Sequence, residues 1–420
     1  MGQADGDSTQ NLHRDAIMDV FVARQPIFNR EKAIFAYELL FRNGDSNSFP
    51  DVDGDTATTS LLSSSFFTVG IDEITDNKRA FINFTDTLLK DGTPQLFSKD
   101  KIVVEILEDV VPTREILEAC RKLKENGYQL ALDDFVYSSD YKELLRICDI
   151  IKVDFRSMSP EGVEKLMVHM QGYSCKLLAE KIETYDDFNR AERLGFDYFQ
   201  GYFFSKPEIL KNKDLSSSQL TIMQLITQLN SKDFDRAALE SILVQDVSVS
   251  YKLINYLNSP HFGRLQPVSS LREAISFLGD KDFRRFATLI ATSKLSNDKP
   301  NELIRHSIIR ARFLELTALE LEENSSELFL LGLFSLVDAI LDKKVKDILA
   351  KLPVSEKIHM ALLEKKGPLY PFLRFIESYE TGNWRAFEFV RRTIALEDSR
   401  IVELYIESVK WADSYRDLRN

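Results

Sequence analysis

The chain has 420 residues, more than a single hydrophobic core usually organises, so we expect about two or three domains. Hydrophobic residues make up 44% of it and charged residues 29%, which is typical of a folded globular protein and excludes a disordered or fibrous one. The formal net charge of −12 argues against a general nucleic-acid clamp, because such proteins gain most of their affinity by neutralising phosphates.

The predicted elements begin after a polar N-terminal segment, residues 1–19, which we expect to be a flexible tail. From residue 20 to 208, short apolar runs alternate with longer segments of helical period, the pattern of successive βα units. The expected strands are 20–23, 34–40, 80–84, 102–106, 129–133, 150–153, 176–179 and 198–204, and the clearest helices are 114–126 and 186–194. This order predicts a TIM-type α/β barrel, in which the carboxyl ends of the strands converge on one face.

The apolar run 129–132 ends in two adjacent carboxylates, Asp133 and Asp134, with no basic residue beside them. The pair could cap the following helix, since acids are favoured in a first helical turn. However, seven of the expected strands carry or precede a polar side chain that could act at one shared mouth: Glu38, Asn83, Glu105, Asp133 with Asp134, Lys152, Glu180 and Gln200. Carboxylates gathered in this way repel one another unless divalent cations lie among them, and oxygen ligands favour Mg²⁺, Mn²⁺ or Ca²⁺ over zinc.

Eight short motifs follow one another along this half of the chain: Gln25-Pro26-Ile27; Glu38-Leu39-Leu40-Phe41-Arg42; Asn83 with Thr85; Glu105 with Glu108; Asp133-Asp134-Phe135; Lys152 with Asp154; Glu180 with Glu183; and Gln200-Gly201-Tyr202 with Phe204 and Pro207. In sequence and order they resemble the EAL domain of bacterial cyclic-di-GMP phosphodiesterases. The resemblance covers roughly residues 20–208, with Leu39 where the E-A-L signature has alanine.

This resemblance implies a role for each matched residue. One Mg²⁺ or Mn²⁺ would be held by Glu38, Asn83, Glu105 and Asp133. Asp133 could also bridge to a second ion near Asp134. Glu180 would be the general base, and Lys152 would steady the attacking water or the phosphate. The contacts to cyclic di-GMP would come from Gln25, Arg42, Gln200 and Glu183. For Arg42, a surface ion pair is the alternative interpretation.

The segment after Asp134 differs from the family pattern. The EAL family has a glycine-rich loop there, whereas this chain continues without a glycine through residues 135–140. Because a β-branched residue such as Val136 resists backbone conformations that glycine adopts, we expect a different loop geometry and reduced turnover. Glu108, which resembles the residue that anchors this loop, is present. The sequence therefore predicts binding of cyclic di-GMP and leaves open whether the barrel hydrolyses it to the linear dinucleotide.

The second half of the chain has the composition of a helical domain. Residues 209–218 form a polar linker, and residues 219–420 show apolar spacing of three and four throughout. The expected helices are 237–244, 248–257, 271–278, 283–292, 303–321, 326–341, 354–364 and 370–379, followed by helical spacing from residue 384. One of these helices ends at a polar turn before Pro260, and another begins at a serine cap and ends at Gly279. These features resemble the HDOD domain over roughly residues 213–410.

The HDOD domain is a helical relative of the HD phosphohydrolases, which bind metal through an adjacent His-Asp pair. None of the three histidines of this half is followed by aspartate: His261, His306 and His359. A second enzyme is therefore not expected. The helical half is predicted to be a regulatory or interaction module that binds an unidentified protein partner.

The remaining composition bears on the compartment. The three cysteines are widely spaced and form no CxxC pair, which fits a reducing cytoplasm. The longest apolar run, 328–341, is interrupted by Asp338 and is shorter than the roughly 20 residues of a membrane span. We therefore expect a cytoplasmic protein without a membrane anchor.

Two alternatives from other functional classes remain at this point. The chain could be a catalytically inactive scaffold that acts through protein–protein contacts, although a scaffold has no reason to concentrate carboxylates at one mouth. A nucleic-acid binder that uses the helical half is the weaker alternative, because the net charge argues against it. The sequence leaves open whether the barrel forms a homodimer.

Overall fold

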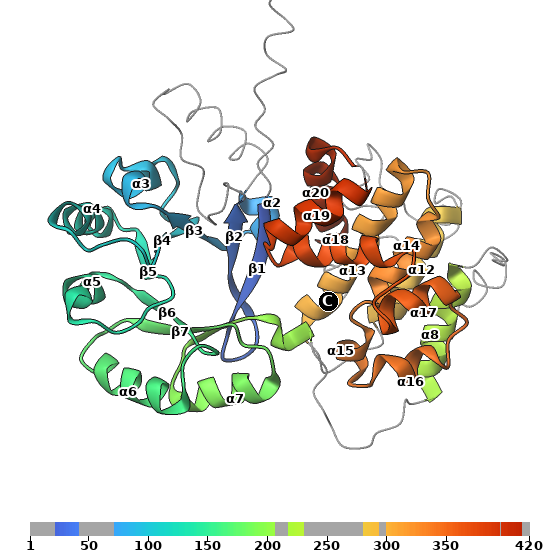
Figure 1. Ribbon diagram of the computed structural model, residues 1–420, viewed down its shortest axis with the longest axis horizontal. Helices are drawn as coiled ribbons and strands as arrows, with labels where there is room; N and C mark the ends of the chain where they lie inside the picture. The colour runs from blue at the N-terminus through green and yellow to red at the C-terminus, as the bar shows by residue number, and fades with distance from the viewer. Residues whose placement is uncertain are drawn as a thin grey trace, which may run out of the picture.

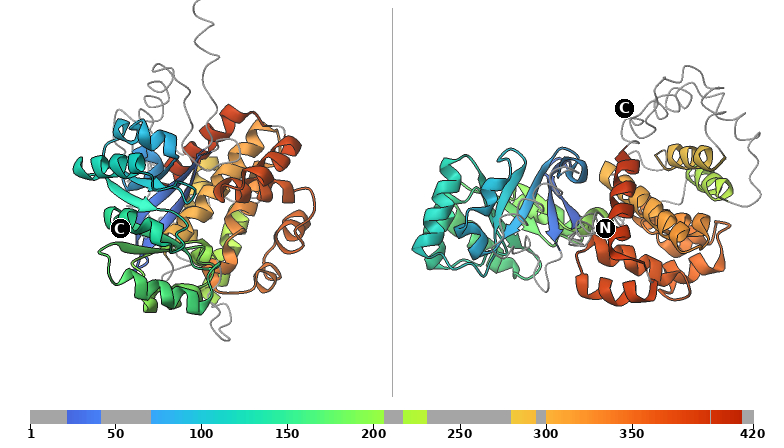
Figure 2. Two further views of the ribbon diagram at one scale, coloured as in Figure 1. Left: turned by 60° about the vertical axis from the view of Figure 1, so that its left-hand side comes forward. Right: turned by 90° about the horizontal axis from the view of Figure 1, so that it is seen from above.

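The computed structural model describes residues 22–41, 71–205, 217–230, 280–293, 300–394 and 396–413. Within these residues an eight-stranded barrel and a helical half lie side by side (Figures 1 and 2). This confirms the predicted order of an α/β barrel followed by an all-α region. Several sequence predictions fall outside the described residues: the tail 1–19, Arg42, most of the linker 209–218, the helices between 237 and 278, and His261.

The barrel closes in the order β1-β2-β3-β4-β5-β6-β7-β8. The strands are β1 Val22–Asn29, β2 Ile34–Phe41, β3 Arg79–Phe84, β4 Ile102–Ile106, β5 Gln129–Leu132, β6 Ile150–Asp154, β7 Lys176–Glu180 and β8 Tyr198–Gln200. From β2 to β8 neighbouring strands are parallel, but β1 is antiparallel to both β2 and β8.

The expectation that all strands point their carboxyl ends to one mouth is therefore wrong for β1. Only residues 30–33 separate β1 from β2, and so short a connection permits only an antiparallel pair. The run predicted at 20–23 is also longer in the structure, because β1 continues through Arg24, Gln25 and Pro26 to Asn29.

Inside the barrel, an apolar layer lies below a polar one, because inward-facing side chains of a strand are two residues apart. The apolar layer consists of Ile27, Ala36, Phe81, Val103, Ala131, Ile150 and Leu178. Two residues beyond six of these positions come Glu38, Asn83, Glu105, Asp133, Lys152 and Glu180. The apolar layer is thus the floor of a polar mouth at the carboxyl ends of β2 to β7.

The helices around the barrel begin at side-chain caps. In α4 (Arg114–Glu125) the Thr113 hydroxyl accepts the Ile116 N–H, and α7 (Tyr185–Leu194) opens with a reciprocal capping box between Thr184 and Asp187. Both helices agree with their predicted ranges to within one residue at each end. The other described α-helices of this half are α2 Ile71–Thr75, α3 Asp86–Lys90, α5 Lys142–Ile147 and α6 Pro160–Met170.

The last predicted strand, 198–204, is shorter than expected. Strand β8 ends at Gln200, and a 3₁₀ helix, η3 Tyr202–Ser205, follows it. The cause is Gly201, which has φ of +145° and lies so close to Ile182 that a Cβ atom would collide with its backbone. The Ile182 N–H donates to the Gln200 carbonyl at 3.0 Å, which fixes the end of β8 beside that of β7.

The helical half is built around α13 (Asn301–Glu320), which is buried on nearly all sides. Helix α14 (Ser325–Phe334) lies close against it because Gly332 lacks a side chain, and a Cβ there would meet the backbone of Arg310 and Ala311. The other described helices are α8 Ser217–Leu229, α12 Asp280–Ser293, α15 Val337–Leu341, α16 Val345–Leu349, α17 Glu356–Leu363, α18 Tyr370–Glu380, α19 Trp384–Ile394 and α20 Asp398–Asp413.

The predicted single helix 326–341 is wrong, because α14 and α15 are separate helices. At the break, the Ser335 hydroxyl donates to the Gly332 carbonyl at 2.7 Å and competes with the helical hydrogen bonds of the backbone. No helix in the described part of the chain is both long enough and apolar enough to cross a membrane.

Strands β1 and β2 lie on the side of the barrel next to the helical half (Figure 1). Buried polar groups connect them to it. The Tyr379 hydroxyl on α18 donates to the Val22 carbonyl at 2.9 Å. The Tyr37 hydroxyl on β2 donates to Glu302 Oε2 on α13 at 3.2 Å, and the Arg24 guanidinium lies 4.7 Å from the centre of the Tyr37 ring. A buried group of phenol, carboxyl and guanidinium therefore joins the two halves.

The pH dependence of stability tests this contact. Burial raises the pKa of Glu302 from 4.5 to about 7, although the Arg24 charge opposes the shift. The folded chain therefore holds this proton more tightly than the unfolded chain, and the resulting stability is present below pH 4.5 and lost as the pH rises through about 7. Between pH 4.5 and about 7, the titration of Glu302 should lower the free energy of unfolding of the wild type by about 3 kcal/mol. We predict that this decrease is absent in Glu302→Gln.

Chemical denaturation of the wild type and Glu302→Gln between pH 4.5 and about 7 measures the free energy of unfolding of each protein. The exposed Glu323 lies just beyond α13, and Glu323→Gln should keep the wild-type profile. Parallel profiles for the wild type and Glu302→Gln would contradict the prediction.

Candidate functional site

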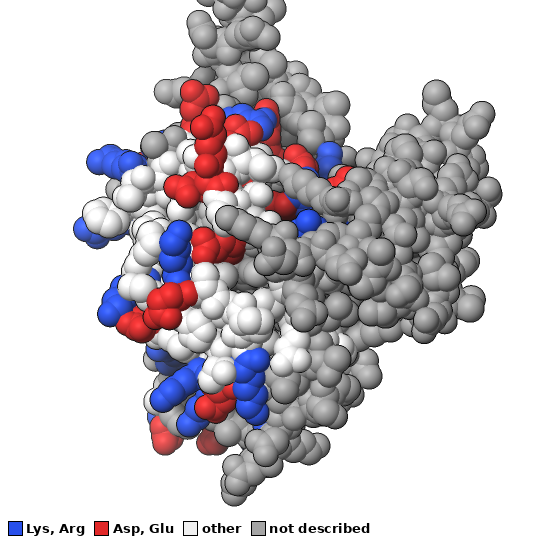
Figure 3. Space-filling model, turned by 90° about the vertical axis from the view of Figure 1, so that its right-hand side faces the viewer, with Lys and Arg blue, Asp and Glu red and all other residues white. Residues whose placement is uncertain are grey.

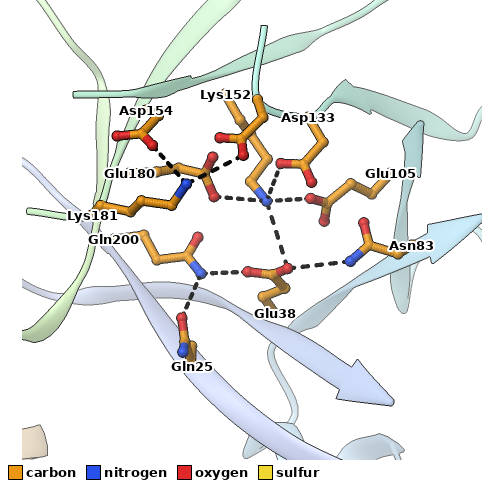
Figure 4. A network of polar contacts seen from close by, with 11 residues as sticks. Gln25, Glu38, Asn83, Glu105, Asp133, Lys152, Asp154, Glu180, Lys181 and Gln200 are labelled. Atoms are coloured by element: carbon orange, nitrogen blue, oxygen red, sulfur yellow. Dashed lines mark hydrogen bonds and ion pairs between the residues drawn. The ribbon is translucent and has the colours of Figure 1, made fainter. Parts of the chain in front are cut away.

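Lys152 lies at the centre of the polar mouth, with its ammonium group surrounded by carboxylates (Figure 4). Its Nζ is 2.9 Å from Asp133 Oδ1 and 2.9 Å from Glu180 Oε1. It also bonds to Glu105 and lies 3.7 Å from Glu38 Oε1. The Lys152 side chain is 1% exposed. Because neither a buried ammonium nor a buried carboxylate is tolerated alone, these groups depend on one another.

Because these groups are buried together, their pKa values are shifted in different directions. Burial raises the pKa of Glu105 and that of Glu180 well above the usual value, and the Lys152 charge offsets this only in part. Burial acts in the same direction on Asp133, but the charge and hydrogen bond of Lys152 outweigh it, so the pKa of Asp133 is lowered. The pKa of Lys152 is raised, because the carboxylates outweigh the effect of burial. The mouth thus combines an ionised carboxylate with two that readily hold a proton.

A second set of hydrogen bonds orients Glu38. The Gln200 amide donates to Glu38 and, at 3.1 Å, to Gln25 Oε1. Asn83 Nδ2 donates to Glu38 Oε1 at 3.3 Å. In the strand register, Gln25 lies opposite Glu38 and Ile27 lies opposite Gln200. The antiparallel β1 therefore still delivers Gln25 to the mouth, from the middle of the strand rather than from its end.

Among the residues that the structure describes, several buried oxygen atoms at the mouth have no hydrogen-bond partner. They are Asn83 Oδ1, Glu105 Oε2, Asp134 Oδ1, Glu180 Oε2 and Gln200 Oε1. Buried polar atoms are rarely left unpaired in folded proteins. Asp133, Asp134 and Glu180 also present ligand oxygens within 4.8 Å of one another. Since carboxylate and amide oxygens are the ligands that hard divalent cations prefer, the residues present fit such an ion.

The segment after Asp134 is held by aromatic side chains. The Tyr137 ring stacks on His169 of α6 with 4.1 Å between the ring centroids. The Tyr141 hydroxyl donates to the Glu108 carbonyl at 3.3 Å. The Glu108 side chain itself is exposed, so this contact with the loop is made through its backbone. The loop therefore has fixed contacts of its own in place of glycine turns.

Two other residues near the mouth form ion pairs that the sequence did not predict. Glu183 forms an ion pair with Arg156. Lys181, which no motif singled out, extends over the mouth, where its Nζ lies 2.7 Å from Asp154 Oδ2 and 3.2 Å from Asp134 Oδ2. A lysine that follows a strand is usually a solvated surface residue. Lys181 differs in its left-handed backbone conformation, which the structure shows and the sequence does not.

The fold and the polar mouth define a class of protein, an EAL-type barrel joined to an HDOD-type helical domain. The EAL domain family matches residues 66–207, and the HDOD domain family matches residues 215–359. Over 412 residues the chain is 35% identical to cyclic di-GMP phosphodiesterase CdgJ of Vibrio cholerae, covering 96% of this chain and 95% of that protein. It is 34% identical over 414 residues to the uncharacterized protein YuxH of Bacillus subtilis, covering 96% and 100%.

The chain therefore belongs to the family of proteins that combine an EAL domain with an HDOD domain. The chain also matches part of the solved structure of Klebsiella pneumoniae BlrP1 in complex with calcium and cyclic di-GMP. It is 20% identical, the match covers 45% of this chain and 56% of that one, and the TM-score is 0.35. The assignment of the barrel rests on its own closed strand order.

Proposed function

We propose that the barrel binds cyclic di-GMP together with Mg²⁺ or Mn²⁺ and hydrolyses it slowly to the linear dinucleotide. The observation that carries this proposal is the set of buried, unpartnered oxygen atoms around Lys152 at one mouth. The similarity to the cyclic di-GMP phosphodiesterase CdgJ supports it, because it extends over both halves of the chain.

The residues that would hold one ion are Glu38, Asn83, Glu105 and Asp133, which come from β2, β3, β4 and the end of β5. Asp133 offers an ionised ligand from the outset, because Lys152 keeps its pKa low. When bound, a divalent ion polarises the phosphodiester and makes an attacking water more acidic. The Gln200 amide holds Glu38 in place for this task.

Glu180 is the proposed general base. Its burial raises the pKa well above the usual value, and a base works best when its pKa approaches the working pH. Lys152 holds the Glu180 carboxylate at 2.9 Å and is placed to steady the phosphate or the water. Gln25, beside Gln200, is the proposed contact to the nucleotide from β1.

The loop after Asp134 is the reason for proposing slow turnover. The stacking of Tyr137 on His169 ties this loop to α6. A loop that is fixed outside the mouth contributes little to closing the site, and catalytic groups in open sites lose part of the benefit of water exclusion.

We also propose that the helical half regulates the mouth. Gln200 donates to Gln25, Gln25 Nε2 donates to the Tyr202 hydroxyl at 3.4 Å, and that hydroxyl donates to the Glu380 carbonyl at 3.0 Å. The Glu380 carboxylate is fully buried on α18 and lies 2.8 Å from Arg310. A protein partner that moved α18 would therefore shift Tyr202 and, through it, the amides at the mouth.

The surface of the helical half fits a protein partner better than a nucleic acid. In the part of this face that the structure describes, Lys and Arg side chains are interspersed with Asp and Glu (Figure 3). Nucleic-acid binding draws on a concentration of basic groups, whereas protein interfaces commonly have a rim of mixed charge.

Calorimetric titration of cyclic di-GMP in the presence of Ca²⁺, followed by product analysis with Mn²⁺, tests the proposed activity. We expect binding to the wild type and slow appearance of the linear dinucleotide. Glu38→Ala should weaken binding at least about 100-fold, since it removes an ion ligand. The exposed Glu118 on α4 forms an ion pair with Arg114, outside the contacts of the mouth, and Glu118→Ala should bind like the wild type.

The possible results separate the candidate functions. Binding without product would make the barrel a receptor rather than an enzyme. No binding to the wild type would contradict the proposal. The scaffold that acts through protein contacts would then be the remaining candidate function.

The proposed regulation has its own test in Tyr202→Phe. This change removes the hydroxyl that links Gln25 to Glu380, and we expect binding of cyclic di-GMP to weaken roughly three- to tenfold. The same calorimetric titration measures it. The matched control is Tyr173→Phe, because the half-buried Tyr173 lies between α6 and β7, outside this chain of hydrogen bonds. Unchanged affinity in Tyr202→Phe would show that the helical half does not act along this route.

A further inference from the structure

Lys181 is held over the mouth by an unusual backbone. It directly follows Glu180 at the end of β7, and its φ of +55° is a left-handed conformation that a lysine rarely adopts. Figure 4 shows its side chain directed toward Asp154. Lys32 and Lys365 share this conformation, so the position of the Lys181 ammonium, and not the backbone angle alone, distinguishes this residue.

The Lys181 ammonium joins two carboxylates from neighbouring strands. Its Nζ lies 2.7 Å from Asp154 Oδ2 at the end of β6 and 3.2 Å from Asp134 Oδ2 after β5. Asp154 is itself fixed, because the Ser157 hydroxyl donates to Oδ2 at 2.5 Å and the Ser157 N–H donates to Oδ1 at 2.9 Å. Lys181 is thus held between a rigid aspartate and the one that would border a second ion.

The two sides of the mouth differ in their balance of charge. Around Lys152, one ammonium faces four carboxylates, and most of the unpartnered oxygens lie there. A divalent ion bound on that side would help to balance the charge that these carboxylates carry when they are all ionised. Around Lys181, one ammonium faces two carboxylates, Asp134 and Asp154, and the second of these also accepts hydrogen bonds from Ser157.

A second divalent ion among Asp133, Asp134 and Glu180 would therefore meet a positive charge that is already in contact with Asp134. Like charges a few ångströms apart repel, although the repulsion is weaker than in a buried site because the Lys181 side chain is 51% exposed. We propose that Lys181 takes the place of a second divalent cation, so that this barrel holds one ion per chain. This inference rests on the proposed function, because it concerns how many ions the same mouth binds.

Counting bound Mn²⁺ tests the inference without any measurement of activity. The full chain is titrated with Mn²⁺ alone by calorimetry, and electron paramagnetic resonance reports whether two bound ions are close enough to couple magnetically. We expect one Mn²⁺ per chain in the wild type and two coupled ions in Lys181→Gly. Lys181→Asn is a second neutral variant that tolerates the left-handed backbone and should also bind two.

Two controls separate charge from backbone effects. Lys181→Arg keeps the charge and should bind one ion. Lys365 has a similar left-handed φ of +53° but lies in the helical half, so Lys365→Gly should also bind one. Two ions in the wild type, or one ion in both neutral variants, would overturn the inference. No Mn²⁺ on any of these proteins would overturn the proposed function itself, so the two failures are distinguishable.

Discussion

The contact between the Lys152 ammonium and the surrounding carboxylates is the interaction on which the mouth of this barrel depends. The floor below it is apolar, so the charges at the strand ends have little solvent to stabilise them. Lys152 compensates part of that charge and sets the order of proton affinity, with Asp133 ionised and Glu180 inclined to hold a proton. The remaining charge and the unpartnered oxygens are what make a divalent ion a suitable occupant.

Much of this mouth could be predicted from the sequence, because two regularities determine it. Side chains of a barrel strand alternate between inside and outside, so a polar residue two positions after an inward apolar one, such as Asp133 after Ala131, lies directly above the floor. The order of the motifs then identifies the family. Polar residues such as Gln25 interrupt the apolar pattern of β1, so the predicted strand ended too early and the short connection that makes β1 antiparallel was not recognised. The position of Lys181 was not predicted because it depends on a backbone angle.

The barrel and the helical half are joined by polar groups that neither half could bury alone. Tyr37 of β2 donates to Glu302 of α13, and Tyr202, just after β8, donates to the Glu380 carbonyl of α18. Buried polar contacts of this kind fix a geometry more strictly than apolar packing does, because a displaced donor loses its partner and remains desolvated. The helical half is therefore linked through Tyr202 and Gln25 to Gln200, although none of its histidines is followed by aspartate.

Diffraction from crystals grown with Mn²⁺ and cyclic di-GMP, recorded at the manganese absorption edge, tests the central claim most directly. We expect an anomalous peak among Glu38, Asn83, Glu105 and Asp133, with a phosphate of the nucleotide beside it. A mouth without such a peak in crystals that contain the nucleotide, or a peak only on the helical half, would contradict the assignment of the carboxylate mouth as the ion and nucleotide site.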